Sequence, residues 1–246
     1  MLATSLQPIR YSVATVDGKR IYTIEDENLE LESVTTVLRV INRPGLNDWR
    51  VKLGREESDR LRDQGGDIGR MAHEAGLRLF KGHGYGSFEW SLLGHPNPED
   101  ERARNAVRAL DLLRRERDLV PMAAEAFVWS RIYGYAGTLD LAADNGDGTV
   151  DIYDWKTSNA IYPEAWLQLA AYAVAWEECH EVPVRRIYPV RLDRGRPDAK
   201  SALYEADTFK EYTDDENNPA GIMQAHLAYL HAQYLGEFIK QHGGRY

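Results

Sequence analysis

Residues 122–158 read MAAEAFVWSRIYGYAGTLDLAADNGDGTVDIYDWKTS, and this stretch decides the fold of the chain. Apolar and polar side chains alternate along it, and it is rich in β-branched and aromatic residues, a pattern typical of β-strands. Asn145-Gly146-Asp147-Gly148 is a turn signal between two of these runs. We therefore predict three consecutive strands, at about 123–131, 135–143 and 149–156.

Helix and strand patterns continue after this stretch. Residues 162–180 are apolar on nearly every face, which indicates a buried helix. A further strand begins at Val184 and leads into a basic loop, and residues 202–207 read as another strand. The chain ends in a long helix that we predict from Pro219 to about His242.

The part of the chain before the strands is mostly helical. Asp17-Gly18 marks a hairpin over residues 10–25, and Ser33 is a good N-cap for a short helix. Three more helices are predicted, at 47–63 (ending at Gly65-Gly66), 68–82 (capped by Asp67) and 98–119.

This order of elements predicts an α/β (α+β) fold with a central mixed β-sheet flanked by helices and a helical N-terminal region. We expect residues 1–66 to form a hairpin and helical region packed on a core of residues 67–246, which includes the C-terminal helix. No linker in the sequence demands two independent domains, so one compact domain is expected.

Composition narrows the class of protein. Of the 246 residues, 43% are hydrophobic and 28% are charged, which suits a globular protein with a full core. The formal charge of −9 argues against coating of nucleic acid by the whole surface. It is compatible with a local basic groove and with carboxylates gathered around a metal ion.

The cysteine count and the length of the apolar runs exclude several classes of site and protein. A single cysteine, Cys179, excludes a disulfide scaffold and any zinc or iron–sulfur site built from several cysteines of this chain. No apolar run approaches the roughly 20 residues that span a bilayer. We therefore expect no membrane association and a cytoplasmic location.

The sharpest chemical feature is GTLD at 137–140 followed by DIYDWKTS at 151–158. Residues i and i+2 of a strand share a face, so Asp154 and Lys156 project together, and a hairpin brings Asp140 beside them. Carboxylates are the ligands that Mg²⁺ prefers, and a neighbouring lysine can orient a metal-bound water. Asp-x-Lys is also common as a surface ion pair, so this pattern alone leaves both interpretations open.

Two polar residues on the predicted apolar helix are candidates for the same site as these carboxylates. Gln168 and Tyr172 are one helical turn apart on an otherwise apolar surface. Buried polar groups need hydrogen-bond partners, so the pair either makes a hydrogen bond within the core or lines the site with the carboxylates.

Together these residues resemble a known family. Gly69-x-x-x-His73, Glu125, GTLD, DWKTS and Gln168-x-x-x-Tyr172 are similar in order and spacing to the PD-(D/E)xK nuclease superfamily, and closest to its RecB-like, phage-type exonuclease branch. The resemblance covers about residues 67–192. It implies a restriction-endonuclease-like core and a metal-dependent DNA exonuclease that acts in phage or bacterial recombination, repair or DNA processing, within the bacterial host cell if phage-encoded.

The resemblance also implies a role for each motif residue. The ligands that it implies for one or two Mg²⁺ or Mn²⁺ ions are His73, Asp140, Asp154 and the main-chain carbonyl of Trp155. Lys156 would position or activate the attacking water, and Glu125 would reach a second metal. Gln168 and Tyr172 would contact the scissile phosphate. Relatives that hold an iron–sulfur cluster use four cysteines, so no such cluster is expected here.

Basic residues follow the motif region and are candidates for binding nucleic acid. Between residues 184 and 200 there are six basic and two acidic side chains. The candidates for phosphate contacts are Arg185, Arg186, Arg191, Arg194 and Arg196. A solvated loop explains these arginines equally well. The implied substrate is DNA, single-stranded or at a free duplex end, and a recombination or replication protein is an expected partner.

Three alternatives remain open. They are an endonuclease, a nucleic-acid-binding or assembly module on a decayed nuclease fold, and an enzyme that uses paired carboxylates on another substrate, such as a glycosidase. Lys156 and the basic segment favour phosphate over sugar. The presence of every motif element argues against decay, and the helical N-terminal third, which would restrict access to a free end, favours an exonuclease.

Overall fold

The computed structural model describes residues 9–41, 44–80, 101–193, 209–211 and 219–241. Within these ranges eight strands form one mixed sheet in the order β1-β2-β3-β5-β6-β7-β8, with β4 paired to β5 beside this path. The strands are β1 (Tyr11–Val16), β2 (Lys19–Ile24), β3 (Leu29–Ser33), β4 (Pro121–Ser130), β5 (Tyr135–Asp144), β6 (Val150–Lys156), β7 (Val184–Leu192) and β8 (Phe209–Glu211).

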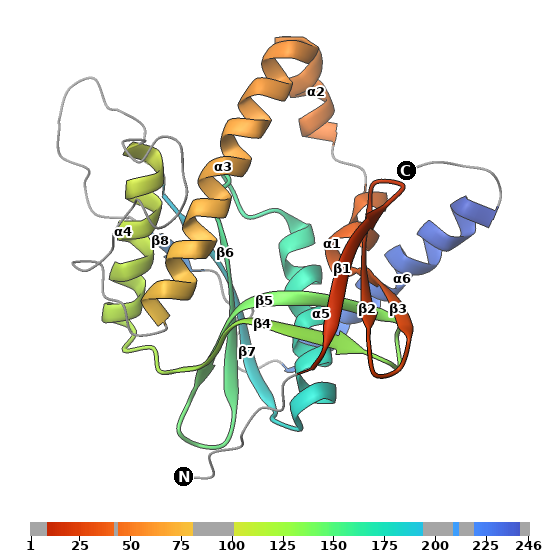
Figure 1. Ribbon diagram of the computed structural model, residues 1–246. Helices are drawn as coiled ribbons and strands as arrows, with labels where there is room; N and C mark the ends of the chain where they lie inside the picture. Colours follow the sequence, from red (N-terminus) through yellow and green to blue (C-terminus); the bar gives the residue numbers. More distant parts are fainter. Residues whose placement is uncertain (1–8, 42–43, 81–100, 194–208, 212–218, 242–246) are drawn as a thin grey trace.

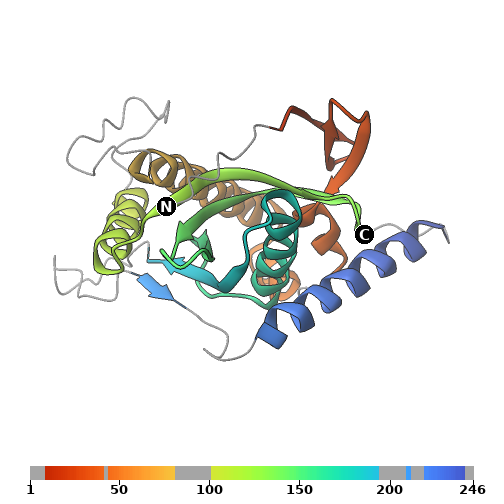
Figure 2. The same cartoon turned by 90° about the horizontal axis from the view of Figure 1, so that it is seen from below.

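Helices cover both faces of the sheet (Figures 1 and 2). They are α1 (Val34–Val37), the 3₁₀ turn η1 (Leu38–Val40), α2 (Pro44–Leu53), α3 (Arg55–Phe80), α4 (Glu101–Glu116), α5 (Pro163–His180) and α6 (Pro219–Gln241). Helices α3 and α4 lie on one face, and α5, with α6 outside it, lies on the other. Among the described residues no helix is both long and apolar enough to cross a bilayer.

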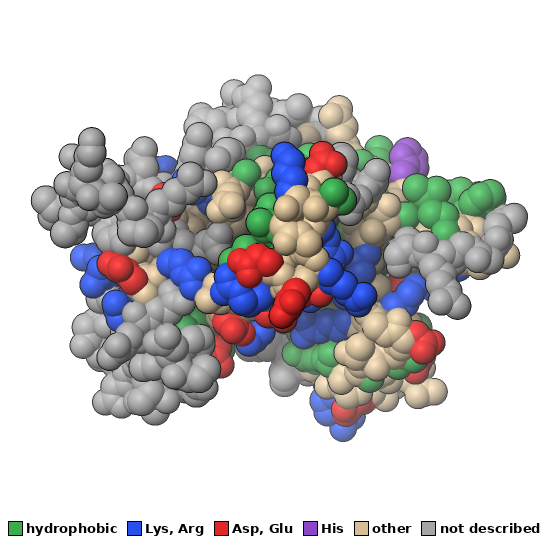
Figure 3. Space-filling model, turned by 90° about the horizontal axis from the view of Figure 1, so that it is seen from above, with side chains coloured by type: hydrophobic (Ala, Val, Ile, Leu, Met, Phe, Trp, Pro, Cys, Tyr) green, Lys and Arg blue, Asp and Glu red, His purple; other side chains and the backbone are tan. Residues whose placement is uncertain are grey.

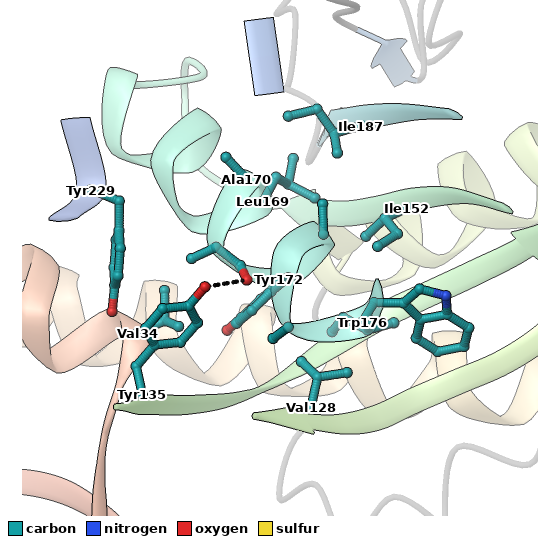
Figure 4. Close-up of a cluster of buried hydrophobic side chains, with 14 of the residues drawn as sticks. Val34, Val128, Tyr135, Ile152, Leu169, Ala170, Tyr172, Trp176, Ile187 and Tyr229 are labelled. Carbon is teal, nitrogen blue, oxygen red and sulfur yellow. Dashed lines mark hydrogen bonds between the residues drawn. The ribbon is translucent and has the colours of Figure 1, made fainter. Parts of the chain in front are cut away.

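The core on the α5 face forms because that helix is apolar nearly all round. Leu169, Tyr172 and Trp176 of α5 pack against Val128 and Ile152 of the sheet (Figure 4). All five side chains are at most 3% exposed. This burial fixes α5 along the strands, and with it the position of every polar group that the helix carries.

A tyrosine ties α6 to the same core. The Tyr135 hydroxyl donates to the carbonyl of Ala171 at 3.0 Å and lies 2.9 Å from Nε2 of His226. His226 is 1% exposed, and its ring stands edge-on to Tyr133. The terminal helix is therefore held by a buried polar contact as well as by apolar packing.

One edge of β5 changes partner midway along the strand. Its first residues, Tyr135 and Ala136, pair in parallel with β3. Its last residues, from Leu141 to Asp144, pair antiparallel with β6. Residues 137–140 lie between these two ladders, and α5 comes close there. A Cβ on Gly137 would lie 2.4 Å from the Tyr172 ring, so only glycine leaves room for that ring.

Most predicted elements are confirmed to within about two residues. The hairpin over 10–25, the helix capped by Ser33, the three central strands and the buried helix are all present, and Ser33 Oγ accepts from the Thr36 amide at 3.1 Å. The restriction-endonuclease-like mixed sheet with flanking helices and a helical N-terminal region is confirmed as well. Strand β3 was not anticipated. The strand expected at 202–207 lies outside the described residues, and the division at residue 66 stays a prediction.

The predicted helix break at Gly65-Gly66 is wrong. Helix α3 runs unbroken through both glycines, so Asp67 lies inside the helix and caps nothing. The break falls instead at Gly54, whose φ of +78° only glycine adopts freely, and whose amide donates to the Arg50 carbonyl at 2.9 Å. Burial of the apolar stripe that begins at Ile68 keeps the long helix intact, although two glycines weaken its interior.

Candidate active site

Helix α3 carries His73 to the sheet on a stripe of small residues. Gly69, His73 and Gly76 follow one another at helical spacing, so they face the same way. A Cβ on Gly69 would touch Thr157 Oγ1 at 3.6 Å, and one on Gly76 would lie 2.9 Å from Cζ2 of Trp155. Gly76 therefore lets α3 approach Trp155 of β6 closely, whereas the contact at Gly69 is an ordinary one, and this approach brings the His73 ring down to β5.

Asp140 receives that histidine. Its Oδ1 lies 2.7 Å from Nδ1 of His73, and its Oδ2 accepts a hydrogen bond from the Trp155 amide at 2.7 Å. Asp140 is 3% exposed. The carboxylate is thus fixed at both oxygens, by a helix on one side and by the backbone of β6 on the other.

Glu125 completes a group of three possible ligands. It lies on β4 between Ala124 and Ala126, which pair with the residues on either side of Asp140. Its φ is +49°, a left-handed conformation that costs a non-glycine residue about 1–2 kcal/mol. Ligand atoms of His73, Glu125 and Asp140 all lie within 4.8 Å of one another. The strained backbone of Glu125 therefore lies where the three side chains meet, and such strain is typical of functional sites.

A second polar group lies beside the first. Asp154 is 1% exposed, and its Oδ2 is 2.5 Å from the Lys156 ammonium. Gln168 joins the two, because its Oε1 accepts from Lys156 Nζ at 3.0 Å and its Nε2 donates to Asp154 Oδ1 at 3.2 Å. Nε2 of Gln168 also donates to the Tyr172 hydroxyl at 3.1 Å. The residues predicted on β6 and α5 are therefore one hydrogen-bonded network.

Burial and charge shift the protonation equilibria of this site. Burial alone would lower the pKa of His73, but the charge of Asp140 and the hydrogen bonds that the ring donates to Asp140 and Glu125 raise that pKa well above its usual range. Burial raises the pKa of Asp140, although the charge on His73 opposes the shift. Burial, reinforced by Asp154, raises the pKa of Tyr172. The neighbouring carboxylates thus favour the protonated imidazole, and a bound metal ion would have to take the place of that proton.

The donor set fits a hard divalent cation. Oε1 of Glu125 and Oδ2 of Asp154 are buried, and each faces a side chain that can carry positive charge, His73 Nδ1 at 3.5 Å and Lys156 Nζ at 2.5 Å. With Asp140 there are three carboxylates for these two groups, a surplus of negative charge that attracts a cation. Carboxylate oxygens and one imidazole are ligands typical of Mg²⁺ and Mn²⁺ sites. His73, Glu125 and Asp140 would hold such an ion, with Asp154 next to it. The part played by the Trp155 carbonyl stays a prediction.

This arrangement agrees with a comparison of sequences. A family model described as the PD-(D/E)XK nuclease superfamily matches residues 50–241. The chain belongs to the PD-(D/E)XK nuclease superfamily. A comparison with curated protein sequences finds no match. Asp140 and the segment Asp154-Trp155-Lys156 carry the residue types of the family name, and their assignment to that motif stays a prediction.

The structure separates the arginines predicted to bind nucleic acid. Arg191 pairs in register with Lys156 on the adjacent strand, so it lies at the same end of the sheet as the site. Arg185 lies six residues from Arg191, about 20 Å along the strand, and forms an ion pair with the buried Asp151 at 2.7 Å. Arg186 is beside it, close to the Tyr188 hydroxyl. Arg194 and Arg196 lie outside the described residues.

The surface above the site has mixed charge. Figure 3 looks down on α2 and α3, where acidic and basic side chains alternate. Many are paired along the helix, such as Arg60 with Glu57 at 2.7 Å and Arg62 with Asp59 at 3.0 Å. The tip of these helices in this nuclease-superfamily member is therefore no continuous basic patch.

Two features of the site had no signal in the sequence. The left-handed backbone of Glu125 is unusual for a glutamate, and no residue pattern marks it. The close approach of Gly76 and Gly137 to aromatic rings depends on tertiary packing. A small residue one helical turn from His73, as in Gly69-x-x-x-His73, was visible in the sequence, but its packing role was not.

Proposed function

We propose that this protein is a metal-dependent DNA exonuclease that hydrolyses phosphodiester bonds, with Mg²⁺ or Mn²⁺ as its cofactor. One observation carries the proposal: three ligand atoms from α3, β4 and β5 converge within 4.8 Å, directly beside the Asp154–Lys156 pair. Membership of a nuclease superfamily and the resemblance to its RecB-like branch support the choice of DNA and of a role in recombination or repair.

Each side chain of the network has a chemical task in this proposal. His73, Glu125 and Asp140 would hold a divalent ion, which would supply Lewis-acid chemistry to the phosphate and to a water molecule. Lys156 orients the attacking water and neutralises the negative charge that develops on the phosphate oxygens. Gln168 fixes both groups, because it accepts from the Lys156 ammonium and donates to Asp154 Oδ1.

Substrate approach follows from the surroundings of the network. Arg191 is on the same face and at the same end of the sheet as Lys156, which suits a contact with the phosphate next to the cleaved bond. Arg185 is engaged with Asp151 at the far end, so we keep only Arg191 of the described arginines in the proposal. A partner protein from recombination or replication, and a cytoplasmic location, stay predictions.

The test compares linear and covalently closed DNA, each single- and double-stranded, with Mg²⁺, with Mn²⁺ and with EDTA. We expect degradation of linear DNA only, and only with metal. Lys156→Ala is expected to abolish cleavage, and Lys52→Ala, which removes an exposed lysine on α2, serves as the matched control. Circular dichroism and a melting curve verify that both variants fold.

Each other outcome has a definite meaning. Cutting of circles would make the enzyme an endonuclease. Cleavage in EDTA, or cleavage by Lys156→Ala at the parental rate, would overturn the proposed chemistry. Binding of DNA with no cleavage under any condition would favour a nucleic-acid-binding module on a nuclease fold.

A further inference from the structure

Three aromatic rings stack at the junction of the N-terminal hairpin and β4. Tyr11 of β1 lies flat on Phe127 of β4, with ring centroids 3.8 Å apart and planes 13° from parallel. Tyr22 of β2 tilts against both rings, at 6.0 Å from Tyr11 and 5.2 Å from Phe127. Figure 1 shows the hairpin crossing in front of β4. The stack therefore joins two segments that are about a hundred residues apart in the sequence.

The stack has a buried end and an exposed end. Tyr22 is 2% exposed, as expected of a ring that only fills the core. Tyr11 is 37% exposed, on a strand whose residues are all exposed. One face of the Tyr11 ring is covered by Phe127, and the ring is the outermost of the three. A large aromatic surface left open in this way is unusual for a core residue and typical of a binding platform.

This exposed ring lies next to the proposed metal ligands. Phe127 is two residues from Glu125 on β4, so the two residues are only about 7 Å apart along the strand, although the left-handed backbone of Glu125 interrupts the regular alternation of side chains there. The pKa of Tyr11 is raised by partial burial and by Tyr22, and the charges of Arg20 and Glu125 act on it in opposite directions. The Tyr11 hydroxyl therefore stands within electrostatic reach of the Glu125 carboxylate.

A cation shares the same face of the hairpin. In the β1–β2 ladder, Tyr11 pairs with Ile24, Val13 with Tyr22 and Thr15 with Arg20, so these side chains project to one side. The guanidinium carbon of Arg20 lies 5.2 Å from the centroid of the Tyr22 ring. Arg20 is exposed, and it can reach an anion that lies along the outer edge of the stack.

We propose that Tyr11 is the platform on which a nucleobase next to the cleaved phosphodiester stacks, with Arg20 as a contact for the adjoining phosphate. This inference rests on the proposed function and narrows its substrate. A base can extend the Tyr11–Phe127 stack only when its own face is free, so the nucleotide beside the metal site is unpaired. The substrate class is then single-stranded DNA or a duplex end whose last base pair has opened.

The first measurement is the affinity of the protein for a short fluorescein-labelled single-stranded oligonucleotide in the presence of Ca²⁺, determined by fluorescence anisotropy. Stacking of one base on an aromatic side chain is worth about 1–3 kcal/mol, so Tyr11→Ala should weaken binding about 5- to 150-fold. Tyr11→Trp should keep the parental affinity. Tyr11→Leu keeps apolar cover over Phe127 but has no flat ring, and should lose affinity as Tyr11→Ala does. Tyr234→Ala, which removes a 70% exposed tyrosine on α6, is the matched control and should bind normally.

The second measurement uses oligonucleotides in which one nucleotide at a time is abasic. At the position that stacks on Tyr11, removal of the base should weaken binding to the parental protein by the same factor as Tyr11→Ala, and should weaken binding to Tyr11→Ala no further. A loss in Tyr11→Ala that persists at every abasic position would overturn the platform, since the variant would then act through folding. Parental affinity of Tyr11→Ala would overturn it too.

The two proposals fail in different ways. If the parental protein binds the oligonucleotide through Tyr11 but never cleaves it in Mg²⁺ or Mn²⁺, the proposed nuclease function fails and the platform stands. If the parental protein cleaves the oligonucleotide and Tyr11→Ala binds and cleaves equally well, the platform fails alone. A protein that neither binds nor cleaves linear DNA, single-stranded or duplex, would overturn both.

Discussion

Gly137→Ala tests how the packing of α5 sets up the proposed active site. A Cβ at this position would lie 2.4 Å from Cε1 of Tyr172 and 3.1 Å from its Cζ and hydroxyl oxygen. Carbon atoms in contact normally keep about 3.5–4.0 Å, so the ring has to move by about 1 Å or more. Tyr172 is 3% exposed and is packed on all sides (Figure 4), so little space is available for that movement.

The expected cost follows from this crowding. Forcing an extra methyl into a well-packed core costs about 1–3 kcal/mol, and the loss of glycine's freedom in the unfolded chain returns only about 0.5 kcal/mol. For a chain of this size the melting temperature should fall by about 2–10 °C. Because Tyr172 accepts a hydrogen bond from Gln168, which holds Lys156 and Asp154, cleavage of DNA should also slow.

Differential scanning calorimetry measures the effect against two references. Gly69→Ala places its Cβ at an ordinary 3.6 Å from Thr157 and should stabilise α3 by up to about 1 kcal/mol. In a Tyr172→Leu background the obstructing ring atoms are gone, so Gly137→Ala should cost almost nothing there. A melting temperature unchanged by Gly137→Ala, or a penalty of equal size in both backgrounds, would refute the reasoning.

Three further outcomes are expected. Gly76→Ala, whose Cβ would lie 2.9 Å from Trp155, should destabilise the protein by about 1–3 kcal/mol in urea unfolding, whereas a stabilised variant would show that α3 does not pack on Trp155 as described. Mn²⁺ at a hundred times its dissociation constant should stabilise the parental protein by about 2.7 kcal/mol and should not stabilise Asp140→Asn, and an equal shift in both proteins would locate the ion elsewhere. Burial lowers the pKa of His226 below its ordinary 6.5, so the unfolded state binds the extra proton first and stability falls as pH drops through 6.5. His226→Gln should flatten that part of the stability curve, and an unchanged slope would contradict the assignment.

The sequence predicted the central strands well because their side chains alternate and their turn is strongly marked. It also identified Asp154 and Lys156 as neighbours, since strand geometry alone puts residues i and i+2 on one face. That Asp140 faces His73 depended on a helix and a strand meeting in space, which only the resemblance to a family implied. The break placed at Gly65-Gly66 was wrong because burial of one helix face outweighed local helix propensity.

Two of the sequence motifs each combine a charged or titratable residue with a glycine that lies against a neighbouring element. In Gly69-x-x-x-His73 the histidine faces Asp140, while the glycine lets the helix come within contact of Thr157. In GTLD the aspartate is the candidate ligand, while Gly137 leaves room for the Tyr172 ring. Gly137 is therefore as necessary as the charged residue, for a different reason, whereas Gly69 has room for a methyl group. Replacing Asp140 should abolish cleavage and leave the fold intact. Replacing Gly137 should impair cleavage indirectly, because it displaces the neighbouring Tyr172 ring.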